Sequence, residues 1–153
     1  MCAYDDGELN DFTSFEMRRA GKEHRCIECG RTIAKDERHE RYGALYDGRM
    51  SSGRTCAHCV EARRWLMKVC NGWLFEGVET DLGEHVGRGD EWWVGDLHVY
   101  RVVRWMGDDW KSRRTGELIP LERVAAEVDA AIAAYVAKEA KAAMLRRMDG
   151  LDA

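Results

Sequence analysis

Four of the six cysteines in this chain form two Cys-x-x-Cys pairs, and their spacing is that of a metal site. The first pair is Cys26 and Cys29, and the second is Cys56 and Cys59. Thiolates are soft ligands that suit Zn²⁺, and four of them complete its tetrahedral shell. Because a full shell leaves no position for water or substrate, the pattern predicts one structural zinc ion.

Two histidines lie near these cysteines in the sequence and are alternative ligands. His24 precedes the first pair, and His58 lies inside the second. We expect coordination by four cysteines, with His58 pointing away from the metal. The chain begins with acidic residues rather than a signal peptide, and no segment approaches the ~20 apolar residues that span a bilayer. The expected compartment is the reducing cytoplasm, where paired cysteines favour metal over a disulfide.

The residues around the cysteines predict the elements that position them. Gly30 follows the first pair and permits the positive φ of a turn, as in a zinc knuckle. An Asp-Gly pair at 47–48 separates two extended runs, 40–46 and 49–55, and predicts a tight hairpin. The second pair continues without a break into 60–70, where apolar residues recur at helical spacing. We therefore place the second pair in the first turn of a helix, whose positive end would stabilise anionic sulfurs.

This order of knuckle, hairpin and helix predicts a treble-clef zinc finger over residues 21–71. A plain zinc ribbon, with both cysteine pairs on hairpins, is the alternative. The predicted fold class is α+β, mostly α: a four-cysteine treble-clef-like finger with one β-hairpin, followed by helices.

A helical region is predicted over residues 72–120, with an amphipathic helix at 73–86 and a third helix at 97–110, where β-branched residues also permit a strand. A basic turn then closes on Pro120, a residue that tolerates the first turn of a helix. From there the chain is rich in alanine, which predicts one long helix over 121–149. At about 40 Å, that helix is longer than so small a domain can cover. It either lies across the preceding helices or protrudes, in which case it offers a surface for a homodimer.

The chain is slightly acidic, with 28 Asp and Glu against 24 Lys and Arg and a net charge of −4. This balance argues against a dedicated DNA-binding protein. Residues 1–16 carry five acidic and no basic side chains, so we expect residues 1–20 to form an acidic arm with little core of its own. Cys2 in this arm receives no role. Cys70 is expected to be a small buried residue on the finger's helix.

Several strings resemble a loose group of small phage and prophage proteins with predicted zinc sites. They are Cys-x-x-Cys-Gly-Arg-Thr-Ile from Cys26, Tyr-Asp-Gly from Tyr46, Thr-Cys-x-x-Cys from Thr55, Gly-Trp-Leu from Gly72, and Asp-Trp-Lys-x-Arg-x-Thr-Gly-Glu-Leu-Ile-Pro from Asp109. The likeness spans roughly residues 17–120 and leaves out the alanine-rich tail. It implies a protein that works in the cytoplasm of a bacterial host and binds host machinery, rather than an enzyme.

Catalysis is not expected from these residues. HNH nucleases use similar frames, but they need a histidine base on the hairpin and a second residue on the helix that grips a catalytic metal. The hairpin offers only His39, which we expect at the surface. An HNH-like nuclease is the remotest alternative.

Nucleic-acid binding by a zinc-finger regulator is the nearer alternative. Basic residues precede the finger and lie on its hairpin and helix, where a shared face would contact phosphates. They are Arg18, Arg19, Lys22, Arg25, Arg49, Arg54, Arg63, Arg64 and Lys68.

Contact with another protein is the leading expectation. Tryptophan and arginine often anchor interfaces, and the chain has six tryptophans. Between residues 76 and 96, seven acidic residues face one arginine, a surface suited to the basic groove of a nucleic-acid-processing complex. The expected contact residues are Trp92, Trp93, Glu76, Glu79, Glu84, Arg63 and Arg64. We thus expect a non-enzymatic, zinc-stabilised binding protein that inhibits or modulates a host or defence complex.

Overall fold

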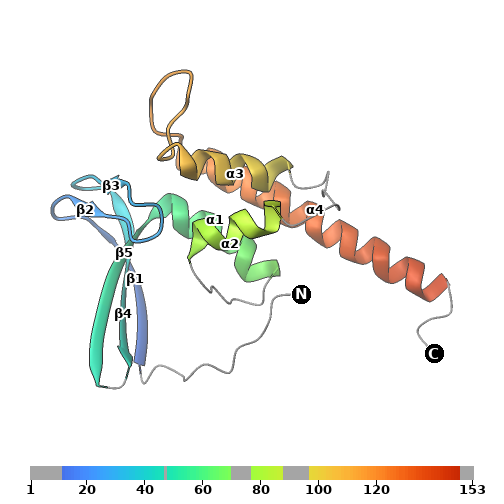
Figure 1. Cartoon of the computed structure of the whole chain (residues 1–153), viewed down its shortest axis with the longest axis horizontal. Helices are drawn as coiled ribbons and strands as arrows, with labels where there is room; N and C mark the ends of the chain where they lie inside the picture. The colour runs from blue at the N-terminus through green and yellow to red at the C-terminus, as the bar shows by residue number, and fades with distance from the viewer. Residues whose placement is uncertain (1–11, 47, 70–76, 88–96, 149–153) are drawn as a thin grey trace.

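The protein combines a narrow antiparallel sheet with a group of helices (Figure 1). The computed structural model describes residues 12–46, 48–69, 77–87 and 97–148. Its three-stranded sheet has the order β1-β4-β5. The strands are β1 (Phe12–Arg19), β4 (Arg38–Tyr46) and β5 (Arg49–Cys56). The fold is thus a mixed α/β arrangement in which the sheet packs against the helices through α1.

The predicted hairpin is confirmed as β4 and β5. Tyr46 pairs with Arg49, and Gly48 between them has a φ of 69°, the left-handed conformation that glycine tolerates best. Pairing continues without interruption to His39 and Cys56, so the register carries Cys56 to the end of the strand. The hairpin therefore sets the position of one cysteine of the second pair.

Strand β1 differs from the expected arm. Residues 12–19 pair with β4 along their whole length, from Phe12 opposite Leu45 to Arg19 opposite Arg38. The side chains from residue 14 to residue 19 are all exposed, so the segment contributes little core, as expected. The strand exists because β4 offers it a row of backbone partners, a non-local cause that its own residues do not reveal.

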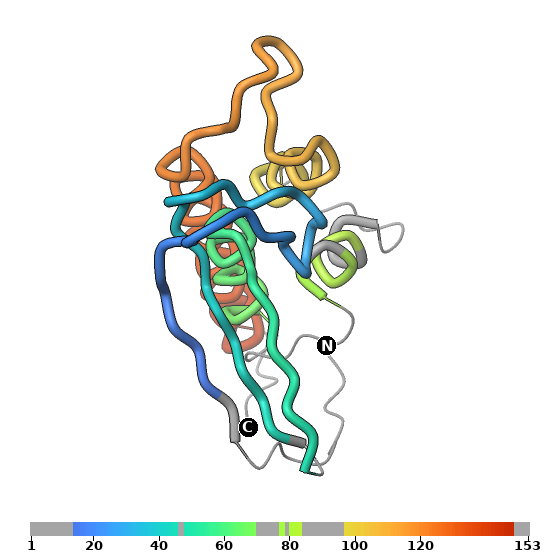
Figure 2. The backbone as a smooth tube through the Cα atoms, turned by 90° about the vertical axis from the view of Figure 1, so that its left-hand side faces the viewer, coloured from blue at the N-terminus to red at the C-terminus, as the bar shows by residue number. Residues whose placement is uncertain are grey.

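A second, two-stranded sheet holds the first cysteine pair. β2 (His24–Arg25) pairs with β3 (Thr32–Ile33), and the knuckle forms the turn between them. The backbone N–H of Ile27 donates to the carbonyl of Arg54 at 2.9 Å, which fastens the knuckle to the edge of β5. Two hairpins and the start of a helix thereby meet at one point (Figure 2).

Four helices follow the sheet. They are α1 (Ala57–Val69), α2 (Val78–Gly87), α3 (Leu97–Gly107) and α4 (Leu121–Met148). The predicted start of the second helix at residue 73 lies outside the described residues, as do Cys2 and Cys70. The helices share one core with the cysteine cluster, and its buried helical members are Ala62, Trp65, Leu66, Val78, Leu82, Val99, Val102, Met106, Val124, Val128 and Ala131.

Helix α4 is only partly covered by this core. Val124, Val128 and Ala131 are buried against its neighbours, whereas the helix continues past them into solvent (Figure 1). The basic turn before it is also present, closed by a bridge between Lys111 and Leu118. No helix among the described residues combines the length and the apolar character needed to cross a membrane.

Candidate metal centre

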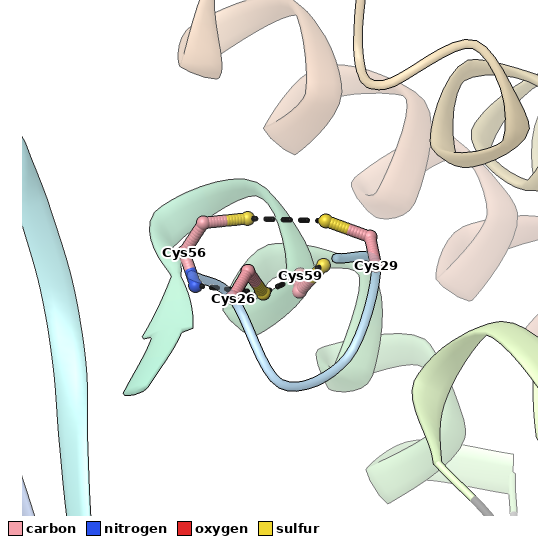
Figure 3. A group of neighbouring side chains, drawn as sticks. All are labelled: Cys26, Cys29, Cys56 and Cys59. Atoms are coloured by element: carbon pink, nitrogen blue, oxygen red, sulfur yellow. Dashed lines mark hydrogen bonds between the residues drawn. The ribbon is translucent and has the colours of Figure 1, made fainter. Parts of the chain in front are cut away.

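The structure brings the sulfurs of Cys26, Cys29, Cys56 and Cys59 together. All four lie within 4.8 Å of one another, with 3.9 Å between Cys26 and Cys59 and 3.9 Å between Cys29 and Cys56 (Figure 3). A tetrahedral ion with metal–sulfur bonds of about 2.3 Å would require sulfur–sulfur separations of about 3.8 Å. The four residues therefore fit one metal ion, and they are the one such cluster within the described part of the chain.

Local backbone geometry explains how these residues converge. Gly30 adopts a φ of 72°, and its N–H donates to the carbonyl of Cys26 at 3.0 Å, which closes the predicted knuckle turn. Cys56 ends β5, and its N–H donates to the Cys26 sulfur at 3.3 Å. Cys59 lies in the first turn of α1, as predicted, where the helix dipole favours negative charge. The four sulfurs thus form a cage whose parts come from a turn, the end of a strand and the start of a helix.

The protonation of the sulfurs depends on the metal. Three of the four residues are buried, and four neighbouring thiols without a metal cannot all be ionised. Hydrogen bonding within the cluster, first of all with Cys26, together with burial raises the pKa of Cys56 and of Cys59 above the ordinary range. Because a metal binds thiolates, its arrival would release these protons.

Arg31 supplies positive charge beside the cage. Its side chain is buried and forms two bonds with the Glu37 carboxylate, one of them from Nη1 at 3.1 Å. Burial alone would lower the pKa of Arg31, but the Glu37 carboxylate and the Cys56 sulfur raise it. A tetrathiolate site with a divalent ion carries an excess of two negative charges, and Arg31 offsets part of it. Sequence reasoning missed this residue, although it follows the knuckle glycine directly.

His58 points away from the sulfurs, as predicted, and joins Arg31 to the start of α4. Its Nε2 lies 2.7 Å from the carbonyl oxygen of Ile119, and its Nδ1 lies 3.3 Å from a guanidinium nitrogen of Arg31. A carbonyl only accepts and a guanidinium only donates, so the imidazole is neutral with its proton on Nε2. In agreement, burial and then the Arg31 charge lower the pKa of His58, against the opposing hydrogen bond to Ile119.

Glu28, between the two knuckle cysteines, anchors the next helix. Its carboxylate accepts a hydrogen bond from the N–H of Val78 at 2.9 Å, at the first residue of α2. The preceding residue, Gly77, has a φ of 124°, and a Cβ there would lie 3.0 Å from the same carboxylate. The residue between the cysteines thus caps a helix 50 positions away.

Replacing Glu28 by alanine is expected to lower the free energy of unfolding by about 0.5–2 kcal/mol, because α2 loses its cap. Metal stoichiometry should stay unchanged, since the four sulfurs keep their positions. Urea unfolding followed by circular dichroism measures the first quantity, and elemental analysis the second. Glu23→Ala, at an exposed position before the knuckle, is the matched control and should have no measurable effect. An equal loss in both variants would contradict the capping role.

Two arginines expected to contact a partner are engaged within the chain. Arg63 on α1 lies 2.5 Å from a carboxylate oxygen of Glu40 and stands 5.7 Å from the ring centre of Phe15. Arg64 lies 2.6 Å from Glu61 and 2.9 Å from Asp129 on α4. These contacts tie α1 to the sheet and to α4. Of the other expected contact residues, Glu79 and Glu84 lie on α2 with side chains that are not described, while Glu76, Trp92 and Trp93 lie outside the described residues.

The prediction of a surface position for His39 is wrong. Its side chain is 1% exposed, and neither ring nitrogen has a hydrogen-bond partner among the described residues. The reason is the β2–β3 hairpin, which folds over this end of the sheet and brings the ring of His24 to 5.7 Å from that of His39. The rings of the two histidines therefore pack against each other.

Comparison of the chain with models of protein families, with curated proteins and with solved structures gave no match. The resemblance to phage proteins therefore stays a prediction from sequence. What the geometry does establish is a cluster of four cysteines placed to bind a metal ion.

Proposed function

We propose that this protein is a non-enzymatic binding protein whose fold is held by one structural zinc ion and which acts through contact with another protein. The chemistry of the donor set supports zinc, because four thiolates at tetrahedral separations suit it better than they suit Mg²⁺ or Ca²⁺. A full shell of protein ligands supports a structural role for the ion, since no position is left for substrate.

A treble-clef arrangement is the form of this finger that we propose. The cysteines of the second pair lie at the end of β5 and in the first turn of α1. A zinc ribbon would instead place both of them on a second hairpin, so the helix start favours the treble clef. The same comparison weakens the HNH-like alternative, because the one histidine of the β4–β5 hairpin, His39, is buried rather than available as a base.

The distal half of α4, residues 133–148, carries the proposal of a protein partner. It projects beyond the body of the molecule and exposes Val136, Met144, Leu145 and Met148, which are 46–70% exposed. Exposed methionines and leucines on a helix are the groups that dock into apolar grooves of other proteins. The same segment carries four basic residues and one acidic residue, so the groove that fits it best has an acidic rim.

Occupation of such a groove is how we propose that the protein would inhibit or modulate a host or defence complex. This places the contact on a different surface from the tryptophans and acidic residues expected at first. It also leaves Arg63 and Arg64 with an internal structural role, since both already pair with carboxylates.

Affinity capture from bacterial lysate tests the proposal when three baits are compared. They are the wild type, Met144→Asp/Leu145→Asp on α4, and Met50→Asp/Met67→Asp, which changes two equally exposed apolar residues elsewhere. We expect one set of proteins to be retained by the first and third baits, to be lost from the second, and to resist nuclease treatment. Light scattering should give a monomer for all three. Recovery of the same proteins with all three baits, or of nucleic acid alone, would overturn the assignment to α4.

A further inference from the structure

The two sides of the β1-β4-β5 sheet differ sharply in character. Side chains alternate between the sides of a strand, so the registers sort them. One side packs on α1 through Glu40, which pairs with Arg63. The other side points away from α1, and we call its exposed part the basic face. Its described members are Ser14, Glu16, Arg18, Arg41, Gly43, Leu45, Met50, Ser52 and Arg54.

Positive charge on the basic face is poorly compensated. Arg41 and Arg54 stand directly opposite each other on neighbouring strands, and neither forms an ion pair within the described residues. Like charges in this position destabilise a sheet unless an anion bridges them. Glu16, the acidic member of the face, pairs with Arg18 at 3.1 Å. The face therefore presents at least two free guanidinium groups side by side.

Charge counts agree with a basic character for this part of the chain. Residues 12–56 contain ten Lys and Arg and seven Asp and Glu, although the whole chain carries −4. The acidic residues that make the net charge negative thus lie outside residues 12–56. The net charge of the chain is therefore compatible with an anion bound at the basic face.

The shape of the face also suits a phosphate backbone. Ser14, Gly43 and Ser52 form one row across all three strands, next to the row of Glu16, Arg41 and Arg54. Small side chains keep this row flat, and the hydroxyls of the two serines donate hydrogen bonds of the kind that phosphate oxygens accept. The aromatic rings of Phe15 and Tyr42 belong to the opposite side, so the described side chains of the basic face offer bases no stacking platform.

We propose that the basic face binds the phosphate backbone of a nucleic-acid duplex, without reading its sequence. Guanidinium groups of Arg41 and Arg54 contact phosphates, Arg18 extends the contact along β1, and the serine hydroxyls add neutral donors. A duplex is favoured over a single strand because the described side chains of the face offer charge and hydroxyls but no aromatic ring. This surface is distinct from the distal half of α4, so it adds a second binding activity to the proposed function.

Fluorescence anisotropy with a labelled 20-base-pair DNA duplex of arbitrary sequence tests the proposal, using the full-length, metal-loaded protein between 50 and 200 mM salt. Three phosphate contacts predict a slope of about −2.7 in a plot of log affinity against log salt. Arg41→Gln/Arg54→Gln should reduce that slope by about two and weaken binding by about tenfold or more at the lower salt. Glu16→Gln should strengthen binding several-fold, because it removes the acidic member of the face.

The matched control is Lys111→Gln/Arg114→Gln, which removes the same charge from exposed positions in the turn before α4, outside both proposed binding surfaces. It should keep the slope of the wild type, and all variants should keep their metal content. An RNA duplex of equal length is tested beside the DNA duplex to show which of the two is preferred. Binding of either duplex supports the proposal if the variants change its affinity and salt dependence as described. Absence of salt-dependent binding, equal losses in both double variants, or tighter binding of the single strand would overturn it.

Discussion

Replacing Cys59 by serine is expected to abolish metal binding and to unfold the junction of sheet and helices. Cys59 is fully buried, and its sulfur belongs to the cage that joins the knuckle, β5 and α1. Structural zinc sites contribute about 10 kcal/mol or more of apparent binding free energy to folding in small fingers, which exceeds the net stability of many domains. Elemental analysis of the purified variant, together with thermal unfolding by circular dichroism, measures both effects.

Cys2→Ser is the control for this change, because it makes the same substitution at a cysteine outside the two pairs. It should retain one metal ion per chain and the unfolding temperature of the wild type. Incubation of the wild type with a strong chelator should reproduce the behaviour of the Cys59 variant. A Cys59→Ser protein that keeps a stoichiometric ion and a cooperative unfolding transition would contradict the four-cysteine cage.

Replacing Arg31 by methionine should lower the free energy of unfolding by about 3–5 kcal/mol, since it leaves the Glu37 carboxylate partly buried without its partner. The change also removes the cation beside Cys56 and the donor to His58. Loss of such an outer partner typically weakens metal binding by about 10–100-fold. Urea unfolding at saturating zinc isolates the first effect, and competition with a zinc-binding dye measures the second.

Arg113→Met gives a matched comparison, because Arg113 also makes two bonds to a carboxylate, that of Asp108, at an exposed site. Exposed pairs of this type contribute about 0–1 kcal/mol, so the control should change stability little and metal affinity not at all. Similar losses of stability and metal affinity in the two variants would mean that burial and the nearby sulfurs do not make Arg31 more important than an exposed arginine. Arg31→Lys is expected to retain only part of the wild-type stability and metal affinity, because lysine cannot form the two-bond geometry.

Local patterns carried much of the information on the metal cluster. The two cysteine pairs, the glycine after Cys29 and the Asp-Gly turn are each short signals whose geometry is set by neighbouring residues, and the knuckle and hairpin follow them. The start of α1 at Ala57 follows from an uninterrupted helical pattern. The long α4 follows from its alanines for the same reason, although its bounds differ slightly from those expected.

Features that depend on distant partners were not predictable in this way. Strand β1 exists through its pairing with β4, and the roles of Arg31 and Glu28 depend on residues far along the chain, His58 and Val78 among them. Trp110 is a further case: it is fully buried with a φ of 61°, and its ring centre lies 5.3 Å from that of His58. Neither the positive φ of Trp110 nor its contact with His58 can be predicted from neighbouring residues, because tertiary packing determines both.

The overhanging part of α4 has a consequence for how the molecule keeps its shape. Three buried residues of α4 fix the direction in which its distal half projects from the core: Val124, Val128 and Ala131. No side chain of residues 133–148 is buried in the described part of the chain, so the helix there depends largely on its six alanines, the residue type with the strongest intrinsic preference for that conformation. The direction of the distal half of α4 is therefore set by packing at its start. Its rigidity is set separately, by its alanine content.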